Sequence, residues 1–175
     1  MDWEDPPGDA STLIYLAKAD GFTFAARCVD WIVVPPSVWR EAVVDGERIG
    51  APEVPLIREA EQHAFLSRVS LGATEQRDAD EIATGNRLGL GESEVLALGR
   101  AKKTAIVDEG RAARVAESLG ILTVSTLFLP VLGVRRRSMR NTEAVAFLHR
   151  LAIVAGARAE VVFEIEQHIR EHHGD

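Results

Sequence analysis

Four carboxylates occupy positions where helices or strands should begin or end: Asp9, Glu41, Glu94 and Asp108. They are far apart along the chain, and each lies beside an apolar run. Carboxylates that converge repel one another and are costly to bury without a cation. Mg²⁺ and similar hard cations prefer oxygen ligands, so converging acids would indicate a metal site.

The neighbouring segments predict where these acids lie. Asp108 directly follows the short apolar run TAIV, which is typical of a buried parallel strand, and Asp9 precedes the apolar helix pattern STLIYLAKA. Glu41 and Glu94 lie in the first turns of predicted helices. Because ligands bind outside the carboxyl ends of parallel strands, we expect all four acids at one edge of a sheet.

A simpler interpretation exists for each acid taken alone. Acidic side chains are favoured in the first turn of a helix, where they interact with the helix dipole. Glu92 and Glu94, in the run GLGESEVLALGRAKK, are especially open to that interpretation. Only the joint placement of the four acids favours a site.

Short apolar runs alternate with helical patterns, which predicts a three-layer α/β/α fold with a short, mostly parallel sheet. Strands are expected in WIVV, TAIV and ILTVS, and helices between them, including one amphipathic helix over residues 52–69. Pro130 should interrupt a helix in STLFLPVLGV. The start, MDWEDPPG, holds two prolines and little β propensity, so the first strand is either very short or atypical.

The length of 175 residues predicts a single domain over 1–175, with residues 140–175 as a C-terminal helical extension joined around Gly156. A net charge of −7 argues against a non-specific nucleic-acid binder, although a metal-binding acid cluster contributes to it. No apolar run approaches the ~20 residues of a membrane helix. Cys28 is the lone cysteine, so a cytoplasmic protein without disulfides or membrane contact is expected.

Several segments together resemble the PIN-domain family: DASTLIYLAKA, VPPSVWREAV, LGLGESEVLALG, IVDEGRAARVAESLG and TVSTLFLPVL. The order and spacing of these segments are similar to the branch with a GExEA-type helix and a D-D/E-x-x-A-R turn, over nearly the whole chain. Members of this family are typically Mg²⁺- or Mn²⁺-dependent ribonucleases. Many are VapC-type toxins neutralised by a cognate antitoxin, and homodimers are a family expectation.

The resemblance gives roles to individual residues. Asp9 matches the aspartate after the first strand that binds metal, and Glu41 matches the acid of the helix after the second strand. Glu94 matches the acid that opens the central helix, with Glu92 as the alternative. Asp108 matches the acid after the next strand.

Further positions follow from the same resemblance. Glu109 stands where the family often has a second aspartate, and Ser11 matches the small hydroxyl residue that orients the first aspartate. Arg111 or Arg114 would lie near the site and could contact phosphate. The sequence thus predicts a metal-dependent endoribonuclease of a toxin–antitoxin pair.

Two other functions remain as alternatives. A non-catalytic PIN scaffold kept for docking a partner would suit the weak first strand and the acidic charge. A phosphoacceptor domain would also have an acidic pocket, but it needs a lysine after a later strand. Here ILTVS ends with Ser125 and is followed by Thr126, with no lysine.

Overall fold

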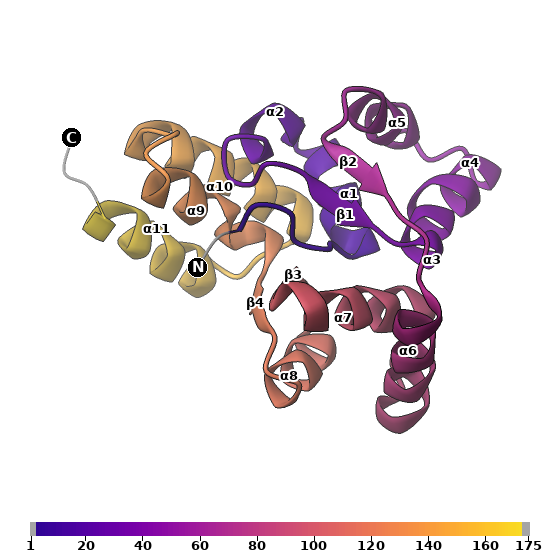
Figure 1. Ribbon diagram of the computed structural model, residues 1–175. Coiled ribbons are helices and arrows are strands. Elements are labelled where there is room, and N and C mark those ends of the chain that lie inside the picture. The colour runs from indigo at the N-terminus through magenta and orange to yellow at the C-terminus, as the bar shows by residue number, and fades with distance from the viewer. Residues whose placement is uncertain (1–2, 173–175) are drawn as a thin grey trace.

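Helices and short strands alternate along the chain in the computed structural model, which describes residues 3–172 (Figure 1). The first half holds α1 (Ala10–Lys18), α2 (Phe22–Ala25), β1 (Ile32–Val34), α3 (Pro36–Trp39), the π-helical segment η1 (Arg40–Asp45), α4 (Gly46–Arg48), α5 (Val54–Gln62) and β2 (Leu66–Arg68). The second half holds α6 (Ala73–Asn86), α7 (Leu90–Lys102), β3 (Thr104–Ile106), α8 (Gly110–Ser118), β4 (Leu122–Val124), the 3₁₀ turn η2 (Thr126–Phe128), α9 (Leu129–Arg135), α10 (Asn141–Ala155) and α11 (Ala159–His172).

Residues 6–9 join two pairs of parallel strands into one sheet. On one side β1 pairs with β2, and on the other β3 pairs with β4. The Val33 N–H donates to the Pro6 carbonyl (3.0 Å), and the Gly8 N–H donates to the Val33 carbonyl (3.1 Å). Toward β3, the Ile106 N–H donates to the Pro7 carbonyl (2.8 Å). The order is therefore β2–β1–residues 6–9–β3–β4, all parallel.

This segment explains how two prolines fit the middle of a sheet. Pro6 and Pro7 lack N–H groups, yet both of their carbonyls accept hydrogen bonds from flanking strands. Gly8 lies so close to β1 that a Cβ at this position would be 2.8 Å from Cγ2 of Ile32. The very short first strand allowed by the sequence is thus present, and residues 1–2 lie outside the described part of the chain.

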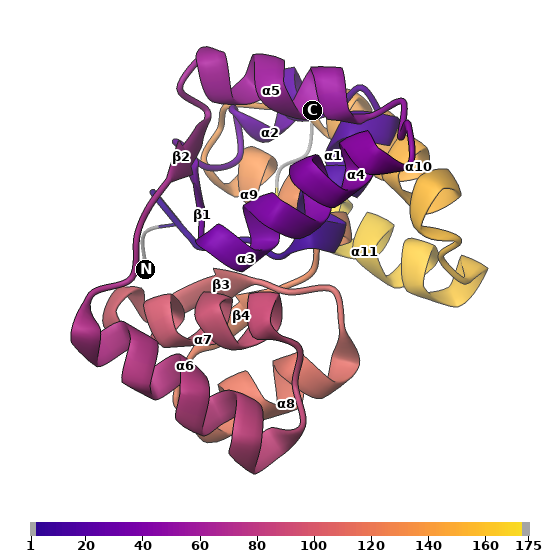
Figure 2. The same cartoon turned by 90° about the vertical axis from the view of Figure 1, so that its right-hand side faces the viewer.

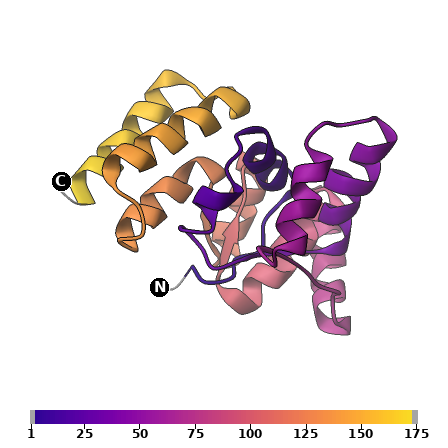
Figure 3. The ribbon, with the colours of Figure 1, turned by 90° about the horizontal axis from the view of Figure 1, so that it is seen from above.

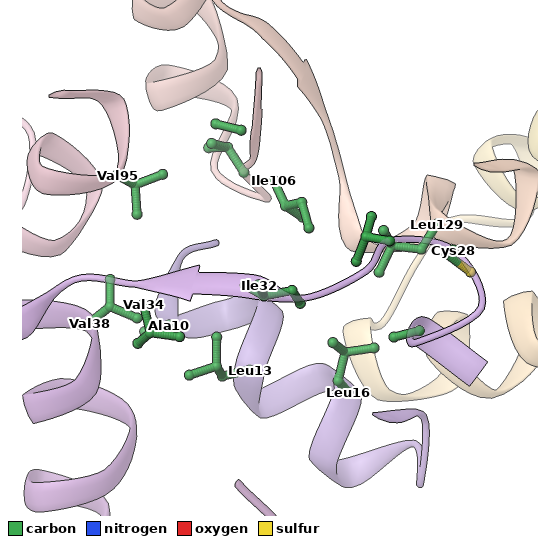
Figure 4. Close-up of a cluster of buried hydrophobic side chains, with 14 of the residues drawn as sticks. Ala10, Leu13, Leu16, Cys28, Ile32, Val34, Val38, Val95, Ile106 and Leu129 are labelled. Atoms are coloured by element: carbon green, nitrogen blue, oxygen red, sulfur yellow. The ribbon is translucent and has the colours of Figure 1, made fainter. Parts of the chain in front are cut away.

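Apolar strands and the helices on both faces form the core. All three residues of β1 and of β3 are buried, as expected for strands covered on both faces. In Figure 4, Leu13 and Leu16 of α1 lie on one side of β1, and Val95 of α7 lies on the other. The predicted α/β class with short parallel strands is confirmed.

Two predicted helices are corrected. The helix expected over residues 52–69 ends at Gln62, because Ala64 takes a left-handed backbone conformation (φ 61°) and the chain continues into β2. Pro130 does not interrupt a helix. It lies in the first turn of α9, where its missing N–H costs no helical hydrogen bond.

The C-terminal helices form the predicted pair. α10 ends at Gly156 in the left-handed conformation (φ 61°), and α11 runs back beside it (Figure 3). Phe147, Leu151 and Ile169 are fully buried in the same hydrophobic cluster as α1 and the strands. Between residues 3 and 172, no helix is long and apolar enough to cross a membrane. Residues 173–175 lie outside the described part of the chain.

Candidate metal site at the edge of the sheet

Residues 6–9 are the point in the sheet from which successive strands are added on opposite sides. From this segment the chain proceeds to β1 and β2 on one side, and it later returns to β3 and β4 on the other. Ligands of open α/β sheets bind outside the carboxyl ends of the strands at such a switch point. Asp9 is the residue that leaves the central segment at this point.

A cleft of about 260 Å³ opens at this edge. We call it the acidic cleft; it is lined by Asp9, Ala10, Ser11, Glu41, Gly89, Leu90, Gly91, Glu92 and Glu109. Four segments supply its walls: the start of α1, the π-helical segment η1, the turn that opens α7, and the turn before α8. Side chains from as far apart in the sequence as positions 9 and 109 therefore line the same cleft.

Asp9 and Asp108 are held against each other. The Asp108 N–H donates to Oδ2 of Asp9 (2.9 Å). The other oxygen of Asp9, Oδ1, accepts from both the N–H and the hydroxyl of Thr12 (2.8 Å each), which also caps α1. Oδ1 of Asp108 accepts from the Thr126 N–H (2.9 Å). Both carboxylates are thus fixed by backbone donors.

Thr12 and Thr126 complete a network that is short of protons. Oxygen–oxygen contacts join Thr12 to Asp9 (2.8 Å) and Asp108 (3.3 Å), and join Thr126 to Asp108 (2.5 Å) and Thr12 (3.1 Å). Each hydroxyl has one proton to donate. Two protons cannot satisfy four contacts, so the network fits an additional proton or a cation.

Burial and neighbouring charges disfavour the ionised forms of these acids. Burial raises the pKa of Asp9, and hydrogen bonds from Asp108 and Thr12 only partly oppose it. Burial, followed by the charge of Asp9, raises the pKa of Asp108 to about 6. The pKa of Glu41 is raised by burial and by the charges of Asp9 and Glu92. Such shifts are typical of functional carboxylates.

Glu94 is not brought into the acidic cleft. Its carboxylate is buried and accepts from the N–H (2.7 Å) and the hydroxyl (2.6 Å) of Ser37 at the start of α3. Glu92 is the acid that α7 presents to the cleft, where its Oε2 also accepts from the Gly89 N–H (2.9 Å). Residues two apart on a helix point about 200° apart, so one face cannot hold both.

The other predicted residues are distributed as follows. Ser11 lines the cleft, but Thr12 is the residue that orients Asp9. Arg111 and Arg114 are exposed on α8, outside the lining of the cleft, and Arg111 donates to the Arg87 carbonyl (3.3 Å). Sequence reasoning missed Thr12 and Thr126, although each hydroxyl directly follows a predicted strand end or helix start.

A divalent cation fits the chemistry of this site. Its donors are all oxygens, and no ion pair within residues 3–172 neutralises an acid of the cleft or Asp108. In the same residues, no three acidic, histidine or cysteine side chains form a ready-made metal cage. Mg²⁺ does not need one, because it keeps several waters and binds through one or two carboxylates.

The fold and the cleft define a parallel α/β protein with an acid-rich site at its topological switch point. Comparison with known families agrees with this class, because a family model described as a PIN domain matches residues 8–161. The chain belongs to this PIN-domain family, whose members are generally nucleases that use divalent metal ions. No curated protein and no solved structure matches the chain.

Proposed function

We propose that this protein is a Mg²⁺- or Mn²⁺-dependent endoribonuclease acting at the acidic cleft. The observation that supports this most strongly is the proton-poor network through which Thr12 and Thr126 join Asp9 and Asp108, two acids whose charges are not balanced by any ion pair in residues 3–172. Family membership gives nuclease chemistry in general. The metal and the RNA substrate are the proposed refinements.

Asp9, which lines the cleft, and Asp108, which contacts it, would hold the metal ion, with Glu92 and Glu109 at the wall of the cleft. When bound, the ion lowers the pKa of a water and balances charge on the phosphate. Glu41, whose pKa is raised by burial and by the charges of Asp9 and Glu92, lines the same cleft and would accept a proton there. In the hydrolysis, a water oxygen bonds to phosphorus and gives up one proton, the bond from phosphorus to the ribose oxygen breaks, and that oxygen takes up one proton.

Asp108→Asn gives the cleaner test of this proposal. An asparagine oxygen can still accept from the Thr126 N–H, and both threonine hydroxyls can turn to accept from its amide. In Asp9→Asn, by contrast, backbone N–H groups face both carboxylate oxygens, so one of them must meet the amide donor.

The experiment measures cleavage of single-stranded RNA with Mg²⁺ or Mn²⁺ by the wild type, Asp108→Asn, Asp9→Asn and a control, Glu117→Gln, exposed on α8. We expect at least a 100-fold loss for both aspartate variants and no loss for the control. Equal activity in all four proteins would refute the proposal.

One observation favours a second candidate, a non-catalytic PIN scaffold that docks a partner. Asp9 and Asp108 already accept hydrogen bonds from protein groups, and residues 3–172 contain no ready-made metal cage. Titration calorimetry with Mn²⁺ separates the two functions. Binding that is lost in Asp108→Asn supports the nuclease, and the absence of binding supports the scaffold.

We also propose the role of a toxin with a cognate antitoxin, and homodimer formation, on the strength of the motif resemblance. Expression of the wild type should arrest growth, and Asp108→Asn should not. A neighbouring gene whose product relieves the arrest would be the antitoxin. Normal growth with abundant wild-type protein would contradict the toxin role without affecting the nuclease proposal.

A further inference from the structure

A second hollow, of about 400 Å³, opens on the carboxyl side of β1 and β2. Its lining includes Val34 at the end of β1, Arg68, Val69 and Ser70 at the end of β2, and Trp39 of α3. We call it the Trp39 groove. It shares the carboxyl edge of the sheet with the acidic cleft but contains none of the residues of that cleft.

Arg68 in the groove has N–H groups available to bind a ligand. The guanidinium of Arg68 lies over the Trp39 ring, 4.5 Å from its centre, within the range of a cation–π contact. Its nearest carboxylate, Oε1 of Glu61, is 3.8 Å away, too far for a hydrogen bond. An arginine in this state can bind an incoming phosphate through two parallel N–H groups.

Arg58 is a natural contrast to Arg68. It approaches the same indole at 5.8 Å, but its guanidinium is already paired with Oε1 of Glu47 at 2.7 Å. It also lies outside the lining of the Trp39 groove. The two arginines therefore share a ring and comparable exposure but differ in availability.

One continuous helical stretch separates the groove from the acidic cleft. Trp39 faces the groove and Glu41, two residues later, faces the cleft, so the two sites lie on opposite sides of a helix about 10 Å across. This helix begins with α3 (labelled in Figure 2), whose first residue, Pro36, is exposed. A strand of about three stacked nucleotides, or fewer when extended, spans that width.

We propose that the Trp39 groove binds the phosphate backbone of single-stranded RNA one to three nucleotides from the bond that is cut, with Arg68 as the phosphate contact. This inference rests on the proposed nuclease function and extends it. The acids of the cleft repel the RNA phosphates. Arg68 supplies a cationic contact that offsets this repulsion. The arginine keeps the strand in place while the cleft holds the scissile phosphate.

The experiment compares Arg68→Ala, Arg68→Lys and Arg58→Ala, each combined with Asp108→Asn so that RNA stays intact. Binding of a labelled 12-nucleotide single-stranded RNA is followed by fluorescence anisotropy at several salt concentrations. We expect Arg68→Ala to weaken binding about three- to tenfold and to reduce the salt slope by about 0.7. Arg68→Lys should recover part of the loss, and Arg58→Ala should change binding less than about twofold.

DNA of the same sequence should show the same loss, because the proposed contact is with the phosphate backbone, which DNA shares. An effect on DNA alone would overturn the proposal, as would equal binding by the Arg68→Ala and Arg58→Ala proteins. Thermal unfolding of both variants checks their folding, since each loses a contact with Trp39.

A cleavage assay with otherwise wild-type protein separates the two proposals. If Arg68→Ala slows cleavage of the 12-mer but not of a dinucleotide, which has no phosphate besides the scissile one, both the groove and the nuclease function are supported. If wild type cleaves RNA but Arg68→Ala matches Arg58→Ala, the groove proposal alone fails. If wild type cleaves no RNA, the nuclease function fails, and the binding comparison still decides the groove.

Discussion

Asp108→Asn should stabilise the metal-free protein at neutral pH while it removes the metal site. The pKa of Asp108 rises from 3.8 to about 6 on folding because of burial and the charge of Asp9. At 1.36 kcal/mol per pKa unit, ionised Asp108 lowers the free energy of unfolding by about 2–3 kcal/mol above pH 6. The asparagine keeps the Thr126 hydrogen bond and carries no charge.

The sign of this effect depends on pH. Because the pKa of Asp108 is higher in the folded state, its favourable contribution is complete below pH 3.8 and disappears as the pH rises through 6. Wild type should therefore lose stability between about pH 4 and 7, and Asp108→Asn should lose less. The difference should grow from near zero at pH 4 to about 2–3 kcal/mol at pH 7.5.

Urea unfolding in EDTA at pH 4.5, 6.0 and 7.5 measures this difference, with Glu117→Gln as a control for the loss of an exposed acid. In thermal unfolding the gain at pH 7.5 corresponds to roughly 5–10 °C for a chain of this size. A gap between variant and wild type that is the same at all three pH values would refute the reasoning. A destabilised variant at pH 7.5 would refute it as well.

Three further predictions concern the same site. Mn²⁺ should raise the thermal stability of wild type more at pH 7.5 than at pH 5.5, because at the lower pH it must displace protons from Asp108; an equal rise would contradict this. Glu92→Gln should reduce RNA cleavage and leave the free energy of unfolding unchanged. Glu94→Gln should lower the free energy of unfolding in urea by about 1–2 kcal/mol and preserve cleavage. The reverse pattern would contradict the placement of these two acids. Thr126→Val should cost about 1–2 kcal/mol and weaken Mn²⁺ binding in calorimetry, and unchanged affinity would show that its hydroxyl does not support the site.

The acids that follow strands were the easiest part of the site to predict. TAIV is a short apolar run, and a residue directly after a parallel strand must lie at the carboxyl edge of the sheet. Asp9 and Asp108 therefore meet as expected (2.9 Å between Oδ2 and the N–H). The helix start was harder, because Glu92 and Glu94 carry the same chemistry and only the direction of α7 decides between them.

Other features could not be read from the sequence because their partners are distant. Thr12 and Thr126 are ordinary hydroxyl residues until the fold brings them within 3.1 Å of each other. β2 was hidden in a longer amphipathic pattern, since its three residues are too few to show an alternation of their own. α6 and α7 lie side by side (Figure 2), and that pairing was likewise invisible in the local pattern.

The central position of residues 6–9 has a consequence for the order in which the protein folds. Gly8 and Ile106 pair across about a hundred residues of chain, so this contact closes a long loop and carries a high entropic cost. Each flanking strand pair can form before it, because β1–β2 and β3–β4 join nearer segments. Residues 6–9 can also pair early with β1, which is near in the chain, so contact of this segment with β3 is expected to be the late step, and the same step brings Asp9 to Asp108. Metal-binding capacity should appear only with the completed sheet, so partly folded chains would be inactive.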